Sequence, residues 1–251
     1  MRALARSFAL FSVVPSGRHG ELTRADAVAA LRWLPLVGAA LGAVAGLPLV
    51  AVREWAPHAT VLGAVLSVCL LVLLTRALHV DGLADTVDGL GSRAPAARAL
   101  EIMRASDIGP FGVLALVLVL LVDVAALTAL PGGRWAPVAA LALAAAAGRV
   151  GVLAGAHRRV PPAHGSGFGS FVAGSVGTPL LAGAVVVLLA AAAAAGRAVG
   201  WVVAPAIGLV LDAAFLAHVV RRLGGVTGDV FGALVELGTA ATLATLGLAL
   251  S

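Results

Sequence analysis

The chain is poor in charge and lacks several common residue types. Only 12% of its 251 residues are Asp, Glu, Lys or Arg, and it contains one Cys and no Tyr. Lys is also absent, so all seventeen basic residues other than His are Arg. We attribute the absence of Lys and Tyr, with the excess of Ala, to the coding bias of a GC-rich genome. Cys69, which lies in an apolar run, is the only cysteine, so an intramolecular disulfide is excluded.

Apolar residues, by contrast, are abundant. They make up 61% of the chain, with a mean hydropathy of +1.07, whereas soluble domains are roughly 45–50% apolar. This composition excludes an ordinary soluble domain. The pI near 11.3 is typical of nucleic-acid binding, but the basic residues are dispersed between apolar runs, which a protein embedded in a bilayer explains better. We therefore expect a lipid bilayer and no nucleic acid as partner. No cleavable signal peptide is apparent, since the first apolar patch, Phe8–Val14, is short.

Seven apolar runs are long enough to cross roughly 30 Å of hydrocarbon as helices. They lie at residues 34–52, 59–78, 112–130, 136–156, 179–195, 201–220 and 231–250. Without a domain boundary, long linker or internal repeat, the sequence predicts one all-α, polytopic integral membrane domain over residues 1–251. The segment Met1–Trp33, with Leu4, Phe8 and Phe11, predicts a short interfacial helix at the membrane surface. The first run also carries small residues at four-residue spacing, which permit close helix packing: Gly38, Gly42 and Gly46.

Arginines are concentrated in alternate connections between these runs. Residues 1–33 hold five of them, and the connections after the second, fourth and sixth runs hold Arg76, Arg93, Arg98, Arg104, Arg158, Arg159, Arg221 and Arg222. The other connections hold only Arg53, Arg134 and Arg197. Since positively charged loops face the cytoplasm, we expect a cytoplasmic N-terminus and an extracytoplasmic C-terminus in a bacterial plasma membrane. All the loops with unusual motifs then lie on the cytoplasmic side.

Acidic residues gather between the second and third runs. Residues 79–112 hold five of the twelve acidic residues, and Asp81, Asp85 and Asp88 stand at i, i+4 and i+7. In a helix, at about 100° per residue, these three carboxylates fall on one narrow stripe. Bunched carboxylates repel one another unless a cation lies between them, and Mg²⁺ prefers such oxygen ligands. The stripe therefore predicts a magnesium site; the alternative is a solvated helix face balanced by nearby arginines.

Two other connections carry unusual residues. Residues 157–171, HRRVPPAHGSGFGSF, combine basic side chains with glycines that let backbone N–H groups approach an anion, although a glycine-rich turn is an equally good interpretation. Residues 224–236, GGVTGDVFGALVE, place Asp229 at the start of a run and Glu236 two turns inside it. Ionisable residues inside a membrane are usually functional. For Asp123 and Asp212, which also lie within runs, we expect a structural partner such as Arg149 or His218.

Three blocks of this sequence resemble the cobalamin synthases, also called adenosylcobinamide-GDP ribazoletransferases. They are HVDGLADTVDG, EIMRASDIGPFG and GGVTGDVFGALVE, and the N-terminal ALFSVVPSG and RWLPLVGAALGAVAG are similar to the family's opening segments. The resemblance runs over nearly the whole chain. It implies an integral membrane enzyme that joins adenosylcobinamide-GDP to α-ribazole, or its 5′-phosphate, and releases GMP with Mg²⁺. It also leaves open a homo-oligomer or an association with other late cobalamin-pathway enzymes.

The resemblance gives these residues expected roles. Asp81, Asp85 and Asp88 would hold one or two Mg²⁺ that neutralise the diphosphate, and Arg104 would clamp a phosphate. The general base is His79, Asp85 or Asp229; in a continuous helix, His79 points opposite the aspartate stripe. The remaining substrate contacts are expected at Arg76, Ser106, Asp107, Gly109, His164, Gly167, Gly169, Gly225, Thr227, Gly228 and Glu236.

The chain departs from the family pattern at two positions. The family's second block reads Met, a basic residue, Asp, Ser, whereas this chain has Met103, Arg104, Ala105, Ser106. Asp107 would then supply the missing carboxylate, which requires non-helical backbone there, and Gly109-Pro110 favours a helix end. In the glycine-rich loop, His164 stands where the family has Arg.

Two other classes of membrane protein fit the sequence less well. CDP-alcohol phosphatidyltransferases also place several Asp beneath a nucleotide diphosphate, but their signature needs an Ala-Arg pair shortly after Asp-Gly. Here Asp81-Gly82 is followed by Ala84-Asp85. A transporter relaying ions through intramembrane carboxylates is disfavoured because the carboxylates cluster in one polar connection and no half of the chain is repeated.

Overall fold

The fold is all-α in the residues described by the computed structural model: 2–15, 22–131, 133–163 and 167–250. Two isolated β-bridges are the only extended pairings there. The helices, in chain order, are α1 (Arg2–Phe11), α2 (Arg24–Leu31), α3 (Leu34–Ala45), α4 (Leu47–Trp55), the 3-10 turn η1 (Pro57–Ala59), α5 (Thr60–Leu74), α6 (Leu78–Gly91), α7 (Ala96–Ile102), α8 (Pro110–Ala129), α9 (Ala136–Gly155), α10 (Phe168–Val172), α11 (Thr178–Ala195), α12 (Gly200–Leu223) and α13 (Gly228–Leu250).

Seven helical segments in the described residues are long and apolar enough to cross a membrane, which confirms the predicted polytopic fold. They are Leu34–Trp55, Pro57–Leu74, Pro110–Ala129, Ala136–Gly155, Thr178–Ala195, Gly200–Leu223 and Gly228–Leu250. Most boundaries agree within a few residues of the prediction. The second was predicted to reach residue 78, but α5 ends at Leu74 because Arg76 and Ala77 adopt left-handed φ angles of 56° and 57°.

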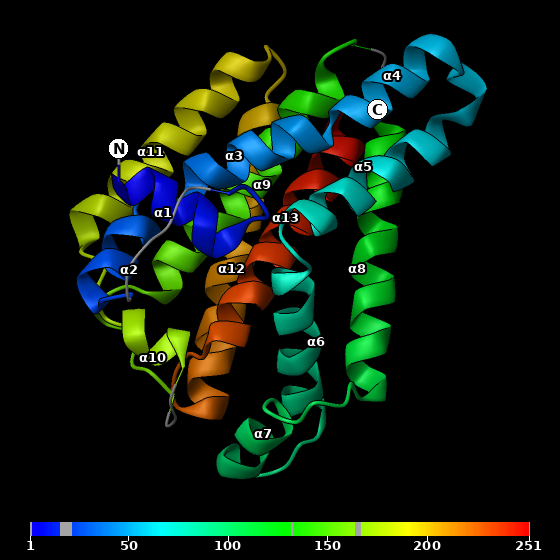
Figure 1. The fold of residues 1–251 in the computed structure, drawn as a ribbon. Helices are drawn as coiled ribbons and strands as arrows, with labels where there is room; N and C mark the ends of the chain where they lie inside the picture. The colour runs from blue at the N-terminus through cyan, green and yellow to red at the C-terminus, as the bar shows by residue number, and fades with distance from the viewer. Residues whose placement is uncertain (1, 16–21, 132, 164–166, 251) are drawn as a thin grey trace.

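The centre of the molecule is formed by α9 and α13, which pack against each other and against α3, α6, α8 and α12 (Figure 1). The predicted row of glycines brings α3 onto α9. A Cβ on Gly42 would lie 2.2 Å from the carbonyl oxygen of Leu141, and one on Gly46 would lie 2.7 Å from the Cα of Val138. Only residues without a side chain permit this approach. The row therefore has the packing role that its spacing predicted.

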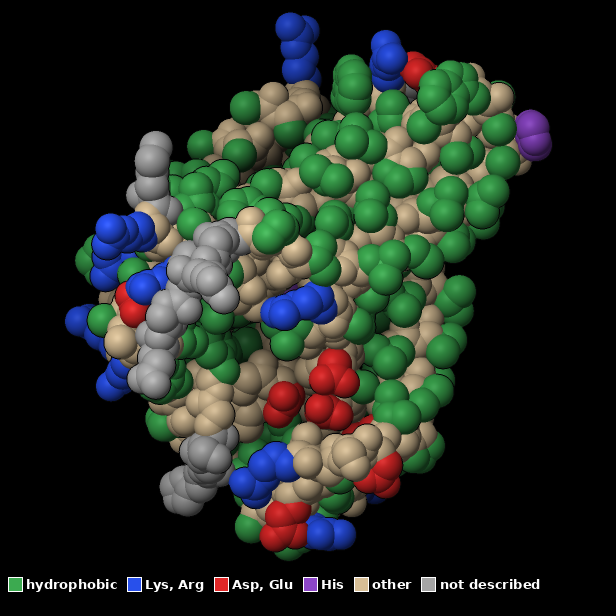
Figure 2. All heavy atoms as spheres, viewed as in Figure 1, with side chains coloured by type: hydrophobic (Ala, Val, Ile, Leu, Met, Phe, Trp, Pro, Cys, Tyr) green, Lys and Arg blue, Asp and Glu red, His purple; other side chains and the backbone are tan. Residues whose placement is uncertain are grey.

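The outer helices are apolar on the side that faces away from the core. Large exposed apolar side chains are numerous on α5, α8 and α11, including Leu73, Leu121 and Val187. Figure 2 shows apolar atoms covering most of the face beside α5 and α8. In water such a surface is costly, whereas a bilayer solvates it. These helices are therefore the lipid-facing part of the protein.

The three motif-bearing connections meet at one end of the helical bundle (Figure 1). The backbone of Ala163 donates to Val226 at 3.0 Å, and Val226 donates to Pro161 at 3.1 Å, which ties the glycine-rich loop to the turn before α13. Arg222 at the end of α12 donates to the carbonyl of Ala94 beside α7. The common location that the arginine pattern predicted is thus observed, and its cytoplasmic orientation remains a prediction.

The N-terminal segment forms two short helices rather than the single interfacial helix expected. Arg6 of α1 pairs with Asp26 of α2. A capping box at Thr23, formed with Asp26, starts α2. The α1 helix also packs on protein: Arg76 donates to the Leu10 carbonyl at 3.0 Å. Tertiary contacts thus hold α1 against the connection between α5 and α6, beside the start of the aspartate helix.

Candidate active site

The aspartate stripe lies on a helix, as its spacing predicted. Helix α6 covers fourteen residues and begins directly after the left-handed residues that end the α5 connection. Burial differs along the stripe: Asp81 is exposed, Asp85 is half-buried and Asp88 is buried. The three carboxylates therefore have unequal access to a ligand.

The Asp88 carboxylate binds the start of α8. Its Oδ2 accepts a hydrogen bond from the N–H of Gly109 at 2.7 Å, and its Oδ1 accepts one from Gly112 at 2.9 Å. The first N–H groups of a helix lack partners within the helix, and a carboxylate there satisfies them. Both glycines are also required sterically, because a Cβ on either would lie 2.4 Å from an Asp88 oxygen. Asp88 thus anchors α8 to α6.

A close crossing of α6 and α13 brings Asp229 to the stripe. A Cβ on Gly82 would lie 2.7 Å from the Asp229 carbonyl oxygen, and a Cβ on Gly232 would lie 2.9 Å from the carbonyl oxygen of His79. Two separate motif blocks, residues 79–89 and 224–236, therefore interlock through their glycines. This contact places a carboxylate from α13 beside those of α6.

Electrostatic repulsion among these carboxylates acts on Asp85. Its pKa is raised to about 6, first by partial burial and then by the neighbouring charges of Asp81, Asp229 and Asp88. The ion pairs among the described residues join Arg6 to Asp26, Arg98 to Glu101 and Arg134 to Glu54, so none neutralises this cluster. The cluster is an unneutralised negative centre.

His79 is buried at the start of α6 and faces Arg149 of α9. Arg149 Nη2 lies 3.4 Å from His79 Nδ1. Burial, followed by the Arg149 charge, holds the pKa of His79 well below its usual range. Because arginine can only donate, Nδ1 is the accepting nitrogen. His79 is therefore a neutral side chain whose accepting nitrogen already has a partner, which argues against its expected role as the general base.

The expected partners of the other intramembrane acids are wrong. Arg149 contacts His79 rather than Asp123 or Asp212. Among the described residues, Asp123 Oδ1 and both carboxylate oxygens of Asp212 lack a hydrogen-bond partner. A Cβ on Gly151 would lie 2.2 Å from Asp212 Oδ2, so a glycine makes room for this side chain. Sequence spacing along separate helices did not reveal which faces meet in the bundle.

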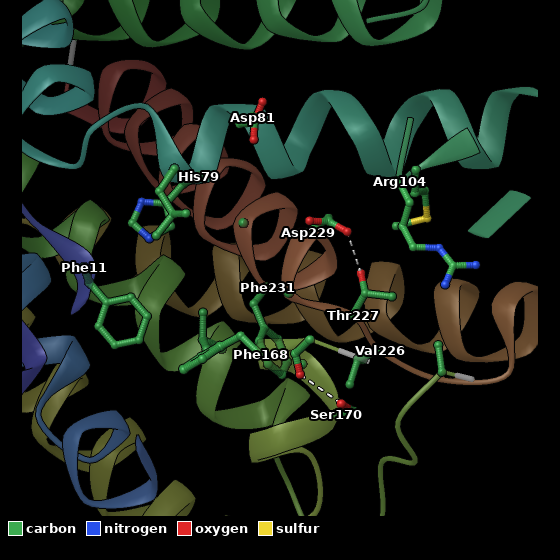
Figure 3. A pocket seen from close by; sticks show the side chains of 18 of the residues that line it. Phe11, His79, Asp81, Arg104, Phe168, Ser170, Val226, Thr227, Asp229 and Phe231 are labelled. Carbon is green, nitrogen blue, oxygen red and sulfur yellow. Dashed lines mark hydrogen bonds between the residues drawn. The ribbon is translucent and has the colours of Figure 1, made fainter. Parts of the chain in front are cut away.

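A cavity of about 510 Å³ opens where α1, α6, α10 and α13 meet. Several predicted site residues line it: His79, Asp81, Arg104, Gly167, Gly169, Thr227, Gly228 and Asp229. Figure 3 shows Asp229 between Asp81 and Thr227, with Arg104 on one side and His79 on the other. The Thr227 hydroxyl donates to Asp229 Oδ2 at 3.2 Å. Arg104 Nε donates to the carbonyl of Leu100 at 3.1 Å, and no described ion pair engages its guanidinium.

Other predicted contacts lie outside this cavity. Asp107 and Gly109 line a second hollow of about 390 Å³ with Asp88, and the backbone from residue 103 to 109 is non-helical, as expected. The remaining predicted site residues line neither cavity in the described part of the chain: Arg76, Asp85, Ser106, Gly225 and Glu236. Gly225 packs on the backbone of residues 161–163 instead. His164 lies outside the described residues.

Several cavity residues had not been predicted. Phe168 and Ser170 belong to the glycine-rich loop, and Phe231 belongs to the block around Asp229, so their neighbours in sequence carried a signal. No such sequence signal pointed to Phe11, because the N-terminal segment was interpreted as a helix lying on lipid. Its ring packs edge-to-face on Phe168, with centroids 5.6 Å apart. The apolar wall of the cavity is thus built from segments far apart in the chain.

The donor set suits a hard divalent cation. Asp81, Asp85 and Asp229 offer only oxygen ligands, and their mutual repulsion lacks a compensating arginine. As the side chains stand, no three acidic, His or Cys groups in the described part of the chain are close enough to enclose an ion. Mg²⁺ commonly uses one or two carboxylates and completes its shell with water and phosphates. An open site of this kind fits the residues present.

Comparisons with known proteins agree on one family. The profile of the family described as cobalamin-5-phosphate synthase matches residues 3–247. Among similar proteins, the adenosylcobinamide-GDP ribazoletransferase of Frankia casuarinae is 36% identical, over 96% of this chain and 93% of its own. Those of Citrobacter koseri and a Nocardioides species are each 40% identical, over 81% and 88% of this chain, respectively, and 81% and 89% of their own.

No solved structure matches this chain. The family profile nevertheless covers almost all of it, and the relatives are 36–40% identical over most of their length. The aspartate stripe, the block around Asp229 and the cavity between them all fall inside the matched region. The chain therefore belongs to the cobalamin-5-phosphate synthase family.

Proposed function

We propose that this chain joins adenosylcobinamide-GDP to α-ribazole, or to its 5′-phosphate, and releases GMP in cobalamin biosynthesis. Family membership supports this reaction, since its relatives carry the name adenosylcobinamide-GDP ribazoletransferase. The structural observation that carries it is the convergence of Asp81, Asp229 and Arg104 on one cavity at the end of the bundle. Such an arrangement suits a diphosphate substrate.

The reaction is a displacement at phosphorus. A ribose-ring hydroxyl oxygen of the acceptor, which is free in both α-ribazole and its 5′-phosphate, forms a bond to the phosphorus attached to cobinamide, and the bond from that phosphorus to the GMP oxygen breaks. The hydroxyl proton passes to a base, and the electron pair of the broken bond leaves with GMP. Displacements of this kind depend on charge neutralisation and alignment more than on covalent catalysis.

Asp229 is the proposed proton acceptor. It lines the cavity, and the Thr227 hydroxyl holds one of its carboxylate oxygens at 3.2 Å. His79 is less suited because its Nδ1 accepts from Arg149. A carboxylate fixed by a neighbouring hydroxyl is well placed to take the proton of a bound nucleophile.

Asp81, which lines the cavity, and Asp85, one turn further along α6, would hold Mg²⁺ beside it. When bound there, the ion would neutralise diphosphate charge and stabilise the leaving oxygen. Asp88 contributes indirectly because its two oxygens bind the backbone of α8. The proposed metal ligands therefore exclude one residue of the predicted stripe.

Two further groups suit the phosphates. Arg104 reaches the cavity with its terminal nitrogens outside any described ion pair. The N-terminus of α13, a helix of 23 residues, also opens onto the cavity at Gly228. Helix N-termini favour anions through the helix dipole and through N–H groups without a partner, although here the Val230 N–H already donates to Thr227 Oγ1 at 3.3 Å. Together they would position the diphosphate between α13 and the end of α7. We place this site at the cytoplasmic face of the plasma membrane, as the arginine distribution predicts.

A product assay tests the proposal. Purified protein receives adenosylcobinamide-GDP, α-ribazole and Mg²⁺, and mass spectrometry follows GMP and the joined corrinoid. We expect equal amounts of the two products, and neither when one substrate is omitted. Release of GMP without ribazole would indicate a hydrolase. No GMP from the complete mixture would reject the proposed reaction.

A further inference from the structure

The cavity has two chemically different ends. Asp81, Asp229 and Arg104 lie toward one end, whereas Phe11, Phe168 and Phe231 lie toward the other (Figure 3). Leu10, Leu34 and Val152 also line the cavity and pack in the same apolar cluster as these three rings. A ligand that fills the whole cavity must therefore combine an apolar part with a polar part that tolerates carboxylates or a bound cation.

The apolar end is held in place by several elements. Phe11 of α1 is 8% exposed, and its ring meets that of Phe168 at an interplanar angle of 79°. Two backbone carbonyls anchor α1 to the α5–α6 corner: that of Leu10 accepts from Arg76 at 3.0 Å, and that of Leu74 accepts from the N–H of Val13 at 2.8 Å. Several elements thus hold the aromatic wall in place, and a further aromatic ring can pack against such side chains by stacking or edge to face.

Two polar side chains lie near the apolar end, and the hydroxyl of one, Ser170, already donates to the Gly167 carbonyl at 2.8 Å. His79 lines the cavity on the side of Phe11 (Figure 3), and its Nδ1 accepts from Arg149 Nη2 at 3.4 Å. Since this nitrogen accepts, the neutral ring carries its hydrogen on Nε2. The apolar end therefore has apolar walls and one N–H donor to offer a ligand.

We propose that this end of the cavity is the subsite for the base of the acceptor nucleoside, with Phe11 determining its specificity. The inference rests on the proposed function and deepens it. The base of ribazole is a dimethylated benzimidazole, a flat fused ring with apolar edges and one free ring nitrogen that accepts a hydrogen bond. Aromatic walls suit the ring, and His79 Nε2–H suits the nitrogen.

The other substrate fits this end poorly. Guanine carries amino, oxo and ring N–H groups, and burying them without partners is costly. A cavity of about 510 Å³ is of the size that holds one small ligand. With the ribazole base at the aromatic end, its sugar hydroxyl extends toward Asp229. The diphosphate then meets that hydroxyl at the carboxylate end.

Substitution of Phe11 tests the subsite, and Phe8 provides a matched control. Phe8 lies on the same helix, is half-buried and does not line the cavity. We expect Phe11→Ala to raise KM for α-ribazole by about 10- to 100-fold, the effect of losing one buried aromatic ring. KM for adenosylcobinamide-GDP should change by less than about threefold, and Phe11→Leu should lie between wild type and Phe11→Ala. Phe8→Ala should behave as wild type.

Direct binding of α-ribazole to the purified protein, without the second substrate, separates the subsite from the reaction. If no GMP forms but Phe11→Ala weakens ribazole binding, the subsite stands and the proposed function fails. If GMP forms and Phe11→Ala leaves the affinity for α-ribazole unchanged, the proposed subsite is wrong and the proposed function stands. A rise in KM for adenosylcobinamide-GDP alone would overturn the proposal by placing guanine at the aromatic end. Equal losses in Phe8→Ala and Phe11→Ala would also overturn it, because α1 would then act only as a structural support.

Discussion

Asp88 and Asp81 stand on the same face of one helix but have different tasks. The Asp88 carboxylate is buried and accepts N–H groups from Gly109 and Gly112. Asp81 is exposed and borders the cavity. Helical spacing groups the two residues, and only their surroundings distinguish the helix anchor Asp88 from Asp81, the proposed metal ligand.

This difference predicts separate effects on stability. Asp88→Ala leaves two N–H groups at the start of α8 without their acceptor and should lower the free energy of unfolding by about 1–3 kcal/mol. Asp81→Ala, on the exposed end of the stripe, should change it by less than about 0.5 kcal/mol in either direction. Chemical unfolding in detergent without Mg²⁺ measures both. Equal stabilities of the two variants would show that Asp88 is not an anchor.

The raised pKa of Asp85 predicts a pH-dependent stability. Its folded pKa of about 6 exceeds the value near 4 expected in the unfolded chain, so the folded protein holds this proton more tightly. Stability without metal should therefore fall as pH rises from about 4 to 6. Asp85→Asn, which removes the repulsion, should raise the melting temperature at pH 7.5 more than at pH 4. If Asp85→Asn instead had a lower melting temperature than the wild type at pH 7.5, the raised pKa of Asp85 would be contradicted.

Mg²⁺ should offset this loss of stability at high pH in the wild type but not in Asp85→Asn. A ligand that binds only the folded protein raises its melting temperature. We expect Mg²⁺ to stabilise the wild type at pH 7.5 and to leave Asp85→Asn nearly unchanged. An equal Mg²⁺ response in both would exclude Asp85 as a ligand.

At the scale of helices, the crossing of α6 and α13 brings the residues of the candidate site together. Gly82 and Gly232 let the two backbones approach until Asp229 stands beside the α6 carboxylates. A single methyl group at this crossing must shift one helix relative to the other. Small displacements of catalytic groups are costly because displacement at phosphorus requires alignment.

We therefore expect Gly232→Ala to reduce turnover by roughly tenfold to a hundredfold. Gly183→Ala on α11 is the matched control, because a Cβ there would meet no heavy atom within 4 Å. Initial rates of GMP release, normalised to folded protein, compare the two variants. Wild-type rates in Gly232→Ala would mean that the crossing tolerates separation and does not position Asp229.

Helices and their faces were largely predictable from sequence, whereas contacts between helices were not. The spacing of Asp81, Asp85 and Asp88 predicted α6, and the row from Gly38 to Gly46 predicted a close helix contact. The contact of His79 with Arg149 depends on how α6 and α9 pack. Phe11 likewise reaches the cavity only because α1 folds back onto protein rather than lying wholly on lipid.

Over the whole molecule, apolar outer helices surround a core and present the site at one end. The arginines of that end have mixed tasks: Arg76 and Arg222 bind backbone carbonyls, and Arg6 binds Asp26. Their distribution still predicts orientation, since charge in short loops is retained in the cytoplasm. The active-site end should therefore face the cytoplasm.

A topology reporter tests this orientation. With seven spans and a cytoplasmic N-terminus, a reporter fused after Ser251 should be extracytoplasmic. One inserted in the loop between α6 and α7, near residue 93, should be cytoplasmic. Cytoplasmic signals at both positions would contradict seven crossings with this orientation.

The most direct test of the account is the rate of GMP release by Asp229→Asn with both substrates and Mg²⁺ saturating. Asp229 lies where the two motif blocks meet, with its backbone against Gly82. It borders the cavity and is the proposed proton acceptor. Loss of a general base typically costs about 10²- to 10⁴-fold in rate. The account predicts a loss of that size with wild-type yield of folded protein, while Gly183→Ala keeps the wild-type rate. Turnover by Asp229→Asn at the wild-type rate would contradict it.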